Sequence, residues 1–481
     1  MPQHEVLGPS WSFARDRARH RRARISTARA VVPRIALIAL GIVLAAIVGA
    51  QAVGGWSRDL LLIVVGLSAA IVLLILAYTR FATFVVAILV IRASVDWTKA
   101  PTQIGEPTRS GMMTTGLAVL FIVAALAWLL VQYKAGRLAR PALLSVVWVA
   151  FLAVTVVSAV TSQRPLDSLV ETGRIAAAVA MLLVLDQLLR SGTYVRPVLA
   201  ACFASALVPI AVAAHQALTT GVAAASDGTG RVYGTFAHPN AFGFYLTILI
   251  VMGVALLPHL TGGVRPPLVL FVWSAAVMIV LTYSRGSWVA LLLGLVVVAL
   301  LQAPRLVLLI LGIAVVVALT VPSVTARVLD LRSEQNIAGV EGDSLQWRFT
   351  YWRTIAGLAD ERPLFGIGPR MTQYVTDQAK VPHNDFLRAY VETGIVGLSA
   401  YAAVVLALIH TARGALARAA PGFERGVAVG FVGCVVSFIV FSVAENLISQ
   451  VVVLWYFAAF AAAAISVTHS SARSQALPTL S

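Results

Sequence analysis

A histidine stands where a polar segment gives way to an apolar one, in the stretch VPHNDFLRAYVETG, residues 381–394. The apolar spacing predicts a helix from Phe386, and Asn384 or Asp385 suits its N-cap. Capping does not account for His383, which comes just before that helix. The positive end of a helix dipole disfavours an imidazolium, so a neutral ring there is suited to accept a proton. His383 is therefore a candidate catalytic base, with a simple role at the helix start as the alternative.

Two arginines precede or interrupt apolar runs. Arg231 opens the stretch RVYGTFAHPNAFGFYL, in which a turn containing His238 leads into the next apolar run. Arg285, in LTYSRGSWVALLL, is the one charged residue between 267 and 302. An arginine at the lip of a membrane helix is costly, which makes it a candidate functional residue, although a tight turn would lower that cost. Arg231 is a candidate for holding an anion, with a solvated loop charge as the alternative. Arg285 is a candidate functional residue, with turn chemistry as the alternative. His238 is better explained as a turn residue than as a second base.

The stretch SLQWRFTYWRTIAGLADERPLFGIG, residues 344–368, has the spacing of an amphipathic helix. Its apolar residues recur every three or four positions: Trp347, Tyr351, Ile355 and Leu358. Aromatic and arginine side chains suit a helix that lies in the lipid headgroup region, with a lid helix packed on the bundle as the alternative. Three side chains are candidates for lining a substrate channel: Arg348, Trp352 and Arg353. Asn384 and Glu392 are candidates for orienting His383, and Glu392 alternatively for pairing with an arginine.

The composition places these residues in a membrane protein. The chain has 481 residues, of which 59% are hydrophobic and 12% charged, against roughly 25% charged in soluble domains. Apolar stretches of about 20 residues, each long enough to cross a bilayer, recur along most of it. Cys202 and Cys434 both lie in apolar runs, and no metal-binding, Walker or dinucleotide-binding motif is present. We therefore expect no metal site and no cofactor, and ATP-driven transport has no support.

Hydropathy predicts an all-α polytopic bundle of 12–14 transmembrane helices. The spans are expected near residues 35–53, 60–79, 81–92, 116–131, 141–161, 175–189, 197–217, 240–257, 267–283, 286–302, 305–322, 391–410, 426–444 and 449–467. With the N-terminus in the cytoplasm, the Lys and Arg residues of the short loops gather inside, and most of the 20 acidic residues fall outside. This orientation puts both termini in the cytoplasm and one long loop, 323–390, on the outer face. The amphipathic helix and the candidate residues then share that face.

The N-terminal segment, residues 1–34, is polar and carries eight arginines. It is too long and too charged for the start of a cleaved signal peptide. We interpret it as a disordered cytoplasmic tail that fixes topology and touches anionic lipid, and nothing in it requires nucleic-acid binding. The predicted organisation is this tail, a membrane domain from 35 to 467, and a cytoplasmic C-terminal tail from 468 to 481.

Four stretches together resemble the O-antigen ligase and Wzy-type polymerase family of membrane glycosyltransferases. They are GTFAHPNAFGFYL, LTYSRGSWVALLLG, WRFTYWRTIAGLADERPLFGIGP and HNDFLRAYVETGIVGL, and they occur in the family's order on the predicted outer face. The resemblance covers about Leu143 to Leu408, and its first part looks like the family's paired upstream helices. The basic tail and two further N-terminal spans depart from the common pattern.

The resemblance implies a metal-independent enzyme of the GT-C type in the bacterial cytoplasmic membrane, active in cell-envelope polysaccharide biosynthesis. Such an enzyme takes a glycan from a polyprenyl-diphosphate carrier, such as undecaprenyl diphosphate, on the outer leaflet. It transfers the glycan, with inversion, to a hydroxyl of a glycan, lipid or protein acceptor. In this sequence the family's diphosphate-binding arginines fall on Arg231 and Arg285, and its essential loop histidine falls on His383.

Two other functions fit part of the sequence. A transporter or flippase of lipid-linked glycans would share the many spans and the arginines. Against it, no inverted repeat is found, and the polar residues gather on one face rather than at the bilayer midplane. A non-catalytic scaffold for envelope assembly would need the loops but not His383. Within the enzyme class, the sequence leaves ligase and polymerase equally open.

Overall fold

The computed structural model describes residues 58–95, 109–220, 230–322, 324–325, 345–376 and 381–476. All regular structure in these residues is helical, so the predicted all-α class is confirmed. Contacts divide the chain into two units, Met1–Ile88 and Leu89–Ser481. The predicted basic tail and the predicted first span at 35–53 lie outside the described residues.

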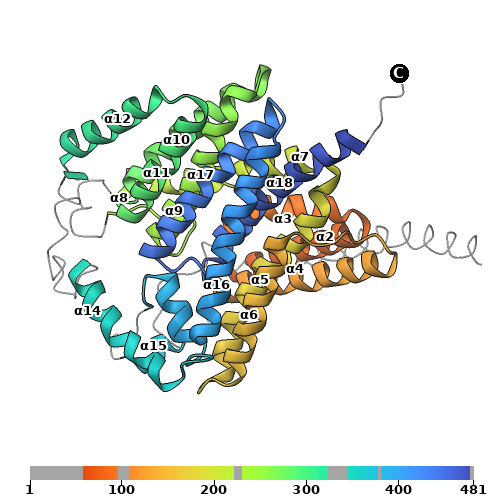
Figure 1. The fold of residues 1–481 in the computed structure, drawn as a ribbon, viewed down its shortest axis with the longest axis vertical. Helices are drawn as coiled ribbons and strands as arrows, with labels where there is room; N and C mark the ends of the chain where they lie inside the picture. Colours follow the sequence, from red (N-terminus) through yellow and green to blue (C-terminus); the bar gives the residue numbers. More distant parts are fainter. Residues whose placement is uncertain are drawn as a thin grey trace, which may run out of the picture. The chain divides into compact units, whose positions relative to one another are not determined.

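The smaller unit is described from α2 (Arg58–Thr79) onward, and α3 (Phe81–Val95) crosses the boundary between the units. The longer helices of the larger unit are α4 (Arg109–Lys134), α5 (Leu143–Val160), α6 (Pro165–Leu188), α7 (Val195–Ala204), α8 (Leu207–Thr220), α9 (Pro239–Leu256), α10 (Arg265–Leu281), α11 (Arg285–Gln302), α12 (Leu306–Thr320), α16 (Asp385–Arg418), α17 (Phe423–Ala444) and α18 (Val451–Ala476). Between α12 and α16 lie α14 (Leu345–Ala356), the short turn η6 (Gly357–Glu361) and α15 (Thr372–Val375). Figure 1 shows α14 and α15 beside the N-terminal end of α16.

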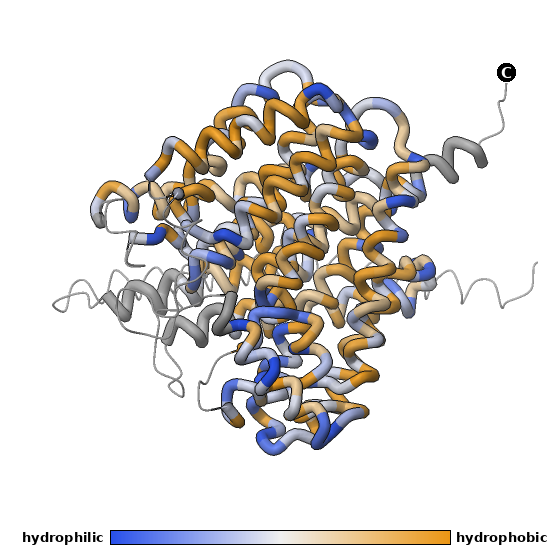
Figure 2. The backbone as a smooth tube through the Cα atoms, turned by 60° about the vertical axis from the view of Figure 1, so that its left-hand side comes forward, coloured by the Kyte–Doolittle hydropathy of each residue, from blue (hydrophilic) through white to orange (hydrophobic). Residues whose placement is uncertain are grey.

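Ten of the described helices are long and apolar enough to cross a membrane, and three shorter apolar helices accompany them. The predicted spans from 60–79 onward fall on these helices, and the single arginine between the ninth and tenth spans does begin a new helix, α11. Figure 2 shows that the helices are hydrophobic along most of their length, while hydrophilic residues gather near their ends. The chain is therefore a multi-pass membrane protein.

Small residues allow three helices to pack closely in the larger unit, where α9, α11 and α17 lie side by side (Figure 1). A Cβ atom added to Gly294 of α11 would lie 2.4 Å from the Oγ atom of Ser437 on α17. A Cβ atom on Gly433 would lie 3.0 Å from the carbonyl oxygen of Gly294. The hydroxyl of Ser437 donates to the carbonyl of Ala290 at 2.7 Å. Close backbone approach through small residues replaces the hydrophobic effect as the packing force between membrane helices.

The helix α16 contains a break at Gly394, whose backbone adopts φ +69° and ψ −171°. Beyond the break, the N–H of Ile395 donates to the carbonyl of Pro363 at 2.8 Å. The N–H of Val396 donates to the carbonyl of Leu364 at 3.3 Å. The backbone groups that the break removes from the helical pattern are thus satisfied by the loop that follows η6, as buried backbone groups require.

The same loop also satisfies the carbonyl groups before the break. The N–H of Ile367 donates to the carbonyl of Val391 at 3.1 Å, and that of Gly368 to the carbonyl of Glu392 at 3.0 Å. The hydroxyl of Ser158 on α5 adds a second hydrogen bond to the Glu392 carbonyl, at 2.6 Å. Hydrogen bonds on both sides of the break therefore join the loop 363–368 to the first turns of α16; we call this arrangement the α16 interlock.

We predict that Gly394→Ala and Gly366→Ala each lower the free energy of unfolding by more than about 2 kcal/mol. Both glycines have positive φ. A Cβ atom added to Gly394 would lie 2.3 Å from the carbonyl carbon of Leu364, and one added to Gly366 would lie 2.4 Å from the carbonyl carbon of Glu392. The matched control is Gly357→Ala, because no atom lies within 4 Å of its added Cβ. Thermal unfolding of purified protein in detergent provides the measurement. Melting of all three variants at one temperature would contradict the interlock.

Candidate functional site

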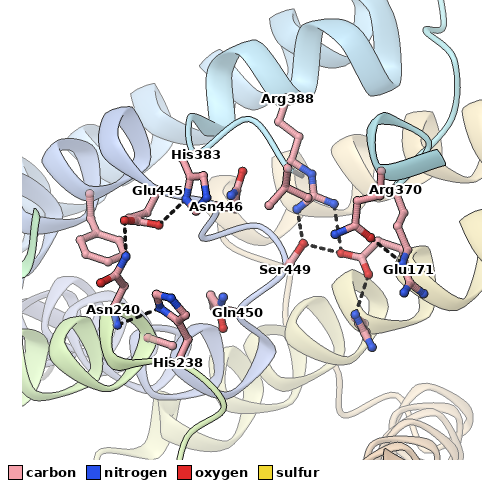
Figure 3. Close-up of a pocket in the computed structure, with 15 residues that line it drawn as sticks. Glu171, His238, Asn240, Arg370, His383, Arg388, Glu445, Asn446, Ser449 and Gln450 are labelled. Carbon is pink, nitrogen blue, oxygen red and sulfur yellow. Dashed lines mark hydrogen bonds and ion pairs between the residues drawn. The ribbon is translucent and has the colours of Figure 1, made fainter. Parts of the chain in front are cut away.

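Five chain segments surround a polar cavity of about 300 Å³ at one end of the larger unit. It is lined by residues of α6, of the start of α9, of the segment around Arg370 to His383, of the first turn of α16, and of the α17–α18 connection. Figure 3 shows the side chains of these segments converging. On the predicted topology, the contributing ends of α6, α9, α16 and α17 all fall on the outer face. The cavity thus brings together sequence segments that hydropathy and the charge distribution assigned to one side.

His383 contributes to this cavity and contacts a carboxylate, with 2.8 Å between its Nδ1 atom and the Oε2 atom of Glu445. The histidine backbone has φ +52°, a left-handed conformation that few residues with a side chain adopt. Asn384 follows as the N-cap of α16, and its side chain accepts from the N–H of Leu387 at 3.0 Å. Of the two capping residues considered, Asn384 therefore fills the N-cap, and His383 is left with a separate contact across the cavity.

Glu445 is a site residue that the sequence reasoning missed. It directly follows α17, and its Oε1 atom accepts from the Nδ2 atom of Asn240 at 2.5 Å. The guanidinium of Arg348 lies 3.5 Å from the same oxygen. The available signal was the pair Glu445-Asn446, polar residues between two long apolar runs. Nothing in the sequence specifies that this connection lies against the segment that carries His383.

Arg231 lies behind the wall of the cavity. Its Nη2 atom donates to the Oδ1 atom of Asn240 at 2.8 Å, and its Nε atom donates to the carbonyl of Thr282 at 2.8 Å. The arginine thereby orients the amide that contacts Glu445, and it joins the end of α10 to the start of α9. His238 is the N-cap of α9, with its Nδ1 atom accepting from the Asn240 N–H at 3.1 Å, and it also lines the cavity.

Arg285 is the first residue of α11 and is half-buried. The helix start is capped by Ser284, whose hydroxyl accepts from the N–H of Ser287 at 3.4 Å. Among the described residues, those that line the cavity include neither Arg285 nor Arg231. The structure therefore joins Arg231 to the Glu445 network by hydrogen bonds, and it places Arg285 at a capped helix start.

The amphipathic helix forms as α14 and η6, with Tyr351 and Ile355 buried and Arg353 exposed. The side chain of Trp347 lies outside the described residues. The indole Nε1 atom of Trp352 donates to the carbonyl of Pro382 at 2.6 Å, so α14 holds the residue before His383.

Two further contacts attach the same helix to its surroundings. Arg348 donates to the carbonyl of Ala444 at 2.6 Å, next to Glu445. The Tyr351 hydroxyl lies 3.2 Å from that of Thr376, and burial raises the pKa of the Tyr351 phenol, which keeps the hydrogen-bonding proton on the ring oxygen. Together these contacts make α14 a support for the two segments that carry His383 and Glu445.

Glu392 pairs with an arginine rather than with His383. Its Oε2 atom accepts from the Nε atom of Arg388 at 2.9 Å, and its Oε1 atom accepts from the hydroxyl of Thr372 at 2.8 Å. Arg388 also contacts Glu171 of α6 at 3.1 Å and the hydroxyl of Ser449. The i, i+4 spacing of Arg388 and Glu392 in an apolar helix was the signal for this pair. Glu171 and Ser449 come from distant segments and had none.

Asp385 is fully buried at the first position of α16. Its carboxylate accepts from the N–H groups of Leu447 at 3.0 Å and Ile448 at 3.2 Å, and from the Tyr401 hydroxyl at 3.2 Å. Buried backbone N–H groups outside a helix need such acceptors. The carboxylate therefore attaches the α17–α18 connection to the start of α16. Asp385 is two residues after His383, and its partner Leu447 is two residues after Glu445.

A comparison with protein families identifies this part of the chain. Residues 270–402 match the family model described as O-antigen ligase. This segment belongs to the O-antigen ligase family. The predicted family is therefore confirmed, and the match supports a membrane enzyme that ligates or polymerises glycans in polysaccharide biosynthesis. No curated protein matches the chain.

The O-antigen ligase match runs from α10 into α16 and contains Arg285, Arg370, His383 and Glu392. Glu171, Asn240 and Glu445 line the same cavity from outside the matched residues. Within the described ranges, no group of three or more His, Cys, Asp or Glu side chains is arranged to hold a metal ion. The cavity is thus built by the ligase segment together with helices on both sides of it.

We predict that Asp385→Ala lowers the free energy of unfolding by about 2–3 kcal/mol, because it leaves two buried N–H groups without their acceptor. Tyr401→Phe removes a hydroxyl donor to the same carboxylate but leaves the hydrogen bonds from both backbone N–H donors in place, and it should cost about 1 kcal/mol. Denaturation curves of the two variants in one detergent give the comparison. Equal stability of Asp385→Ala and wild type would refute the attachment of the two segments by this carboxylate.

Proposed function

We propose that the protein is a GT-C type glycosyltransferase that moves a glycan from a polyprenyl-diphosphate carrier to an acceptor hydroxyl. The acceptor is a glycan, a lipid or a protein, and transfer takes place at the outer face of the cytoplasmic membrane. The observation that carries this proposal is the hydrogen bond between His383 and Glu445 in a polar cavity of the O-antigen ligase segment.

His383 serves as the general base in this proposal. An ionised carboxylate can only accept hydrogen bonds, so Glu445 fixes the imidazole tautomer with the proton on Nδ1. The basic nitrogen is then Nε2, which takes the proton of the acceptor hydroxyl. The carboxylate also stabilises the imidazolium that forms, as in other histidine–carboxylate pairs. General base catalysis of this kind contributes on the order of 10²–10⁴-fold to the rate.

The bond changes balance without a redox partner. The acceptor oxygen forms a bond to the anomeric carbon while the bond from that carbon to the diphosphate oxygen breaks. The proton goes to His383, and the diphosphate leaves with the bonding electron pair. Attack on the side opposite the leaving group inverts the anomeric centre.

Stabilising the negative charge that develops on the diphosphate lowers the reaction barrier more than proton removal does. Guanidinium groups provide this stabilisation through paired contacts to phosphoryl oxygens. By family resemblance Arg231 and Arg285 have this role. The contact of Arg231 with Asn240, and the start of α9 at the cavity, support a positive environment there. Since guanidinium groups supply the charge stabilisation, we propose that the reaction needs no metal ion.

Orientation in the membrane follows the charge distribution. The contributing ends of α6, α9, α16 and α17 share one side of the larger unit, which supports an alternating topology with both termini in the cytoplasm. On that topology the cavity opens toward the outer leaflet, where a lipid-linked donor would be presented.

The first test is glycan transfer by purified wild type in detergent with EDTA, compared with His383→Ala. We expect wild-type transfer to survive the chelator and kcat of the variant to fall on the order of 10²–10⁴-fold. Full activity of His383→Ala would show that His383 is not the general base. No transfer by wild type from any polyprenyl-diphosphate donor, combined with movement of such donors across vesicles, would favour the transporter alternative.

Glu445→Gln tests the positioning of the base. The amide cannot stabilise an imidazolium, so kcat should fall about 100-fold with KM nearly unchanged, and the pH profile of kcat should move. Glu424→Gln is the matched control, because Glu424 lies in the first turn of the same helix, at the end away from the cavity. A rise in KM alone, with kcat and its pH profile intact, would assign Glu445 to substrate binding instead.

A further inference from the structure

Arg370 lies on the side of the cavity away from His383. Figure 3 shows Arg370 and Glu171 on one side and His383 with Glu445 on the other. The backbone of Arg370 has φ +69°, which is costly for a residue with a side chain. Such conformations persist only where the surrounding structure determines them, and they cluster at functional sites.

The surroundings of Arg370 fix its backbone from both directions. The hydroxyl of Ser168 on α6 donates to the carbonyl of Pro369 at 2.8 Å. One residue earlier, Gly368 is part of the α16 interlock, and a Cβ atom there would lie 2.3 Å from the Cβ atom of Ser162. The N–H of Met371 returns to the carbonyl of Gly368 at 3.1 Å. The arginine is thus held in place by three neighbouring segments before any ligand binds.

The side chain of Arg370 is braced at one edge. Its Nε atom donates to the Oε1 atom of Gln373 at 3.0 Å, and its guanidinium lies 5.8 Å from the ring centroid of Tyr374. Within the part of the chain that the structure describes, its two terminal nitrogens have no acceptor and it forms no ion pair. By contrast, Arg388 contacts both Glu171 and Glu392. Arg370 therefore presents its two terminal guanidinium nitrogens as hydrogen-bond donors at the wall of the cavity. None of the described carboxylates forms an ion pair with it.

Arg174 adds a second guanidinium to the same lining. It lies one turn after Glu171 on α6 and pairs with that carboxylate at 2.9 Å, while 41% of its side chain remains exposed. Because Glu171 is shared between Arg174 and Arg388, it compensates each of them only in part. The charge on this side of the cavity favours an anion.

We propose that Arg370, assisted by Arg174, binds an anionic group of the substrate, a phosphate or a carboxylate, opposite His383. The planar fork of Arg370 matches the paired oxygens of either group. The inference rests on the proposed transfer reaction, and two parts of its substrate carry this chemistry. One is the diphosphate of the donor, which must leave on the side opposite the base. The other is an acidic substituent of the glycan, such as a uronic acid carboxylate.

The test uses full-length purified protein and measures transfer kinetics of wild type and Arg370→Gln with inorganic pyrophosphate or glucuronate as competitor. We expect the inhibition constant of one competitor to rise at least tenfold in the variant, because that competitor binds more weakly. If the group bound is the diphosphate, pyrophosphate inhibition weakens and kcat also falls on the order of 100-fold. If it is an acidic sugar, glucuronate inhibition weakens and kcat is retained. Unchanged inhibition by both competitors would overturn the proposal.

Two controls separate this result from misfolding and from failure of the transfer reaction. Arg305→Gln removes an exposed arginine at the start of α12, beyond the far end of α11. Both competitors should inhibit this variant as strongly as they inhibit wild type. Arg370→Lys keeps the charge without the fork, and it should fall between wild type and Arg370→Gln. If wild type and the Arg370 variants all transfer glycan, and inhibition by both competitors is the same in all of them, the result contradicts this inference alone. Loss of transfer in His383→Ala remains the separate test of the reaction.

Discussion

The arrangement of the site depends on one constraint, that a helix broken inside a membrane protein must find other partners for its backbone groups. At Gly394 those partners come from the loop 363–368, which supplies two acceptors beyond the break and two donors before it. The same hydrogen bonds that complete α16 therefore fix the loop. Arg370 and Thr372 follow that loop, and the first turns of α16 carry Arg388 and Glu392. Their mutual positions are therefore fixed by these backbone hydrogen bonds, together with packing of the buried side chains of Ile367, Met371 and Val391.

Buried charge is the second determinant, and it extends the fixed region to more of the chain. Asp385 holds the α17–α18 connection through two N–H groups, and Arg388 joins α6 to α16 through Glu171 and Glu392. A buried charge without a partner would be strongly destabilising, so each pair specifies a particular arrangement of segments. The hydrogen bond between His383 and Glu445 then forms between two segments that are already held.

Much of the fold followed from local sequence, because apolar length and charge asymmetry are properties of single segments. They predicted the helices and the helix boundary at Arg285, and the motif order predicted the family. Capping preference narrowed the N-cap of α16 to Asn384 or Asp385, and the structure shows Asn384 there. The partners of the candidate residues could not be predicted in the same way. Glu445 lies 62 positions from His383, and the approach of their segments depends on Asp385, whose acceptor role no local pattern reveals. The conformation of Arg370 likewise follows from contacts with α6 and α16, which are remote in sequence.

The cavity has two chemically different sides, and that difference suits a displacement reaction. On one side a histidine contacts a carboxylate, an arrangement that accepts a proton and stabilises the resulting cation. On the other side a braced arginine presents donors to the cavity. In the proposed transfer, the attacking hydroxyl loses positive charge as a proton, the leaving group gains negative charge as a diphosphate, and in-line geometry separates these events across the anomeric carbon. A base and an anion-binding group on the same side would oppose that separation. The polarity of the cavity is therefore a stronger argument for group transfer than either residue is alone, because a passage for intact lipid-linked glycans needs the positive side but not the base.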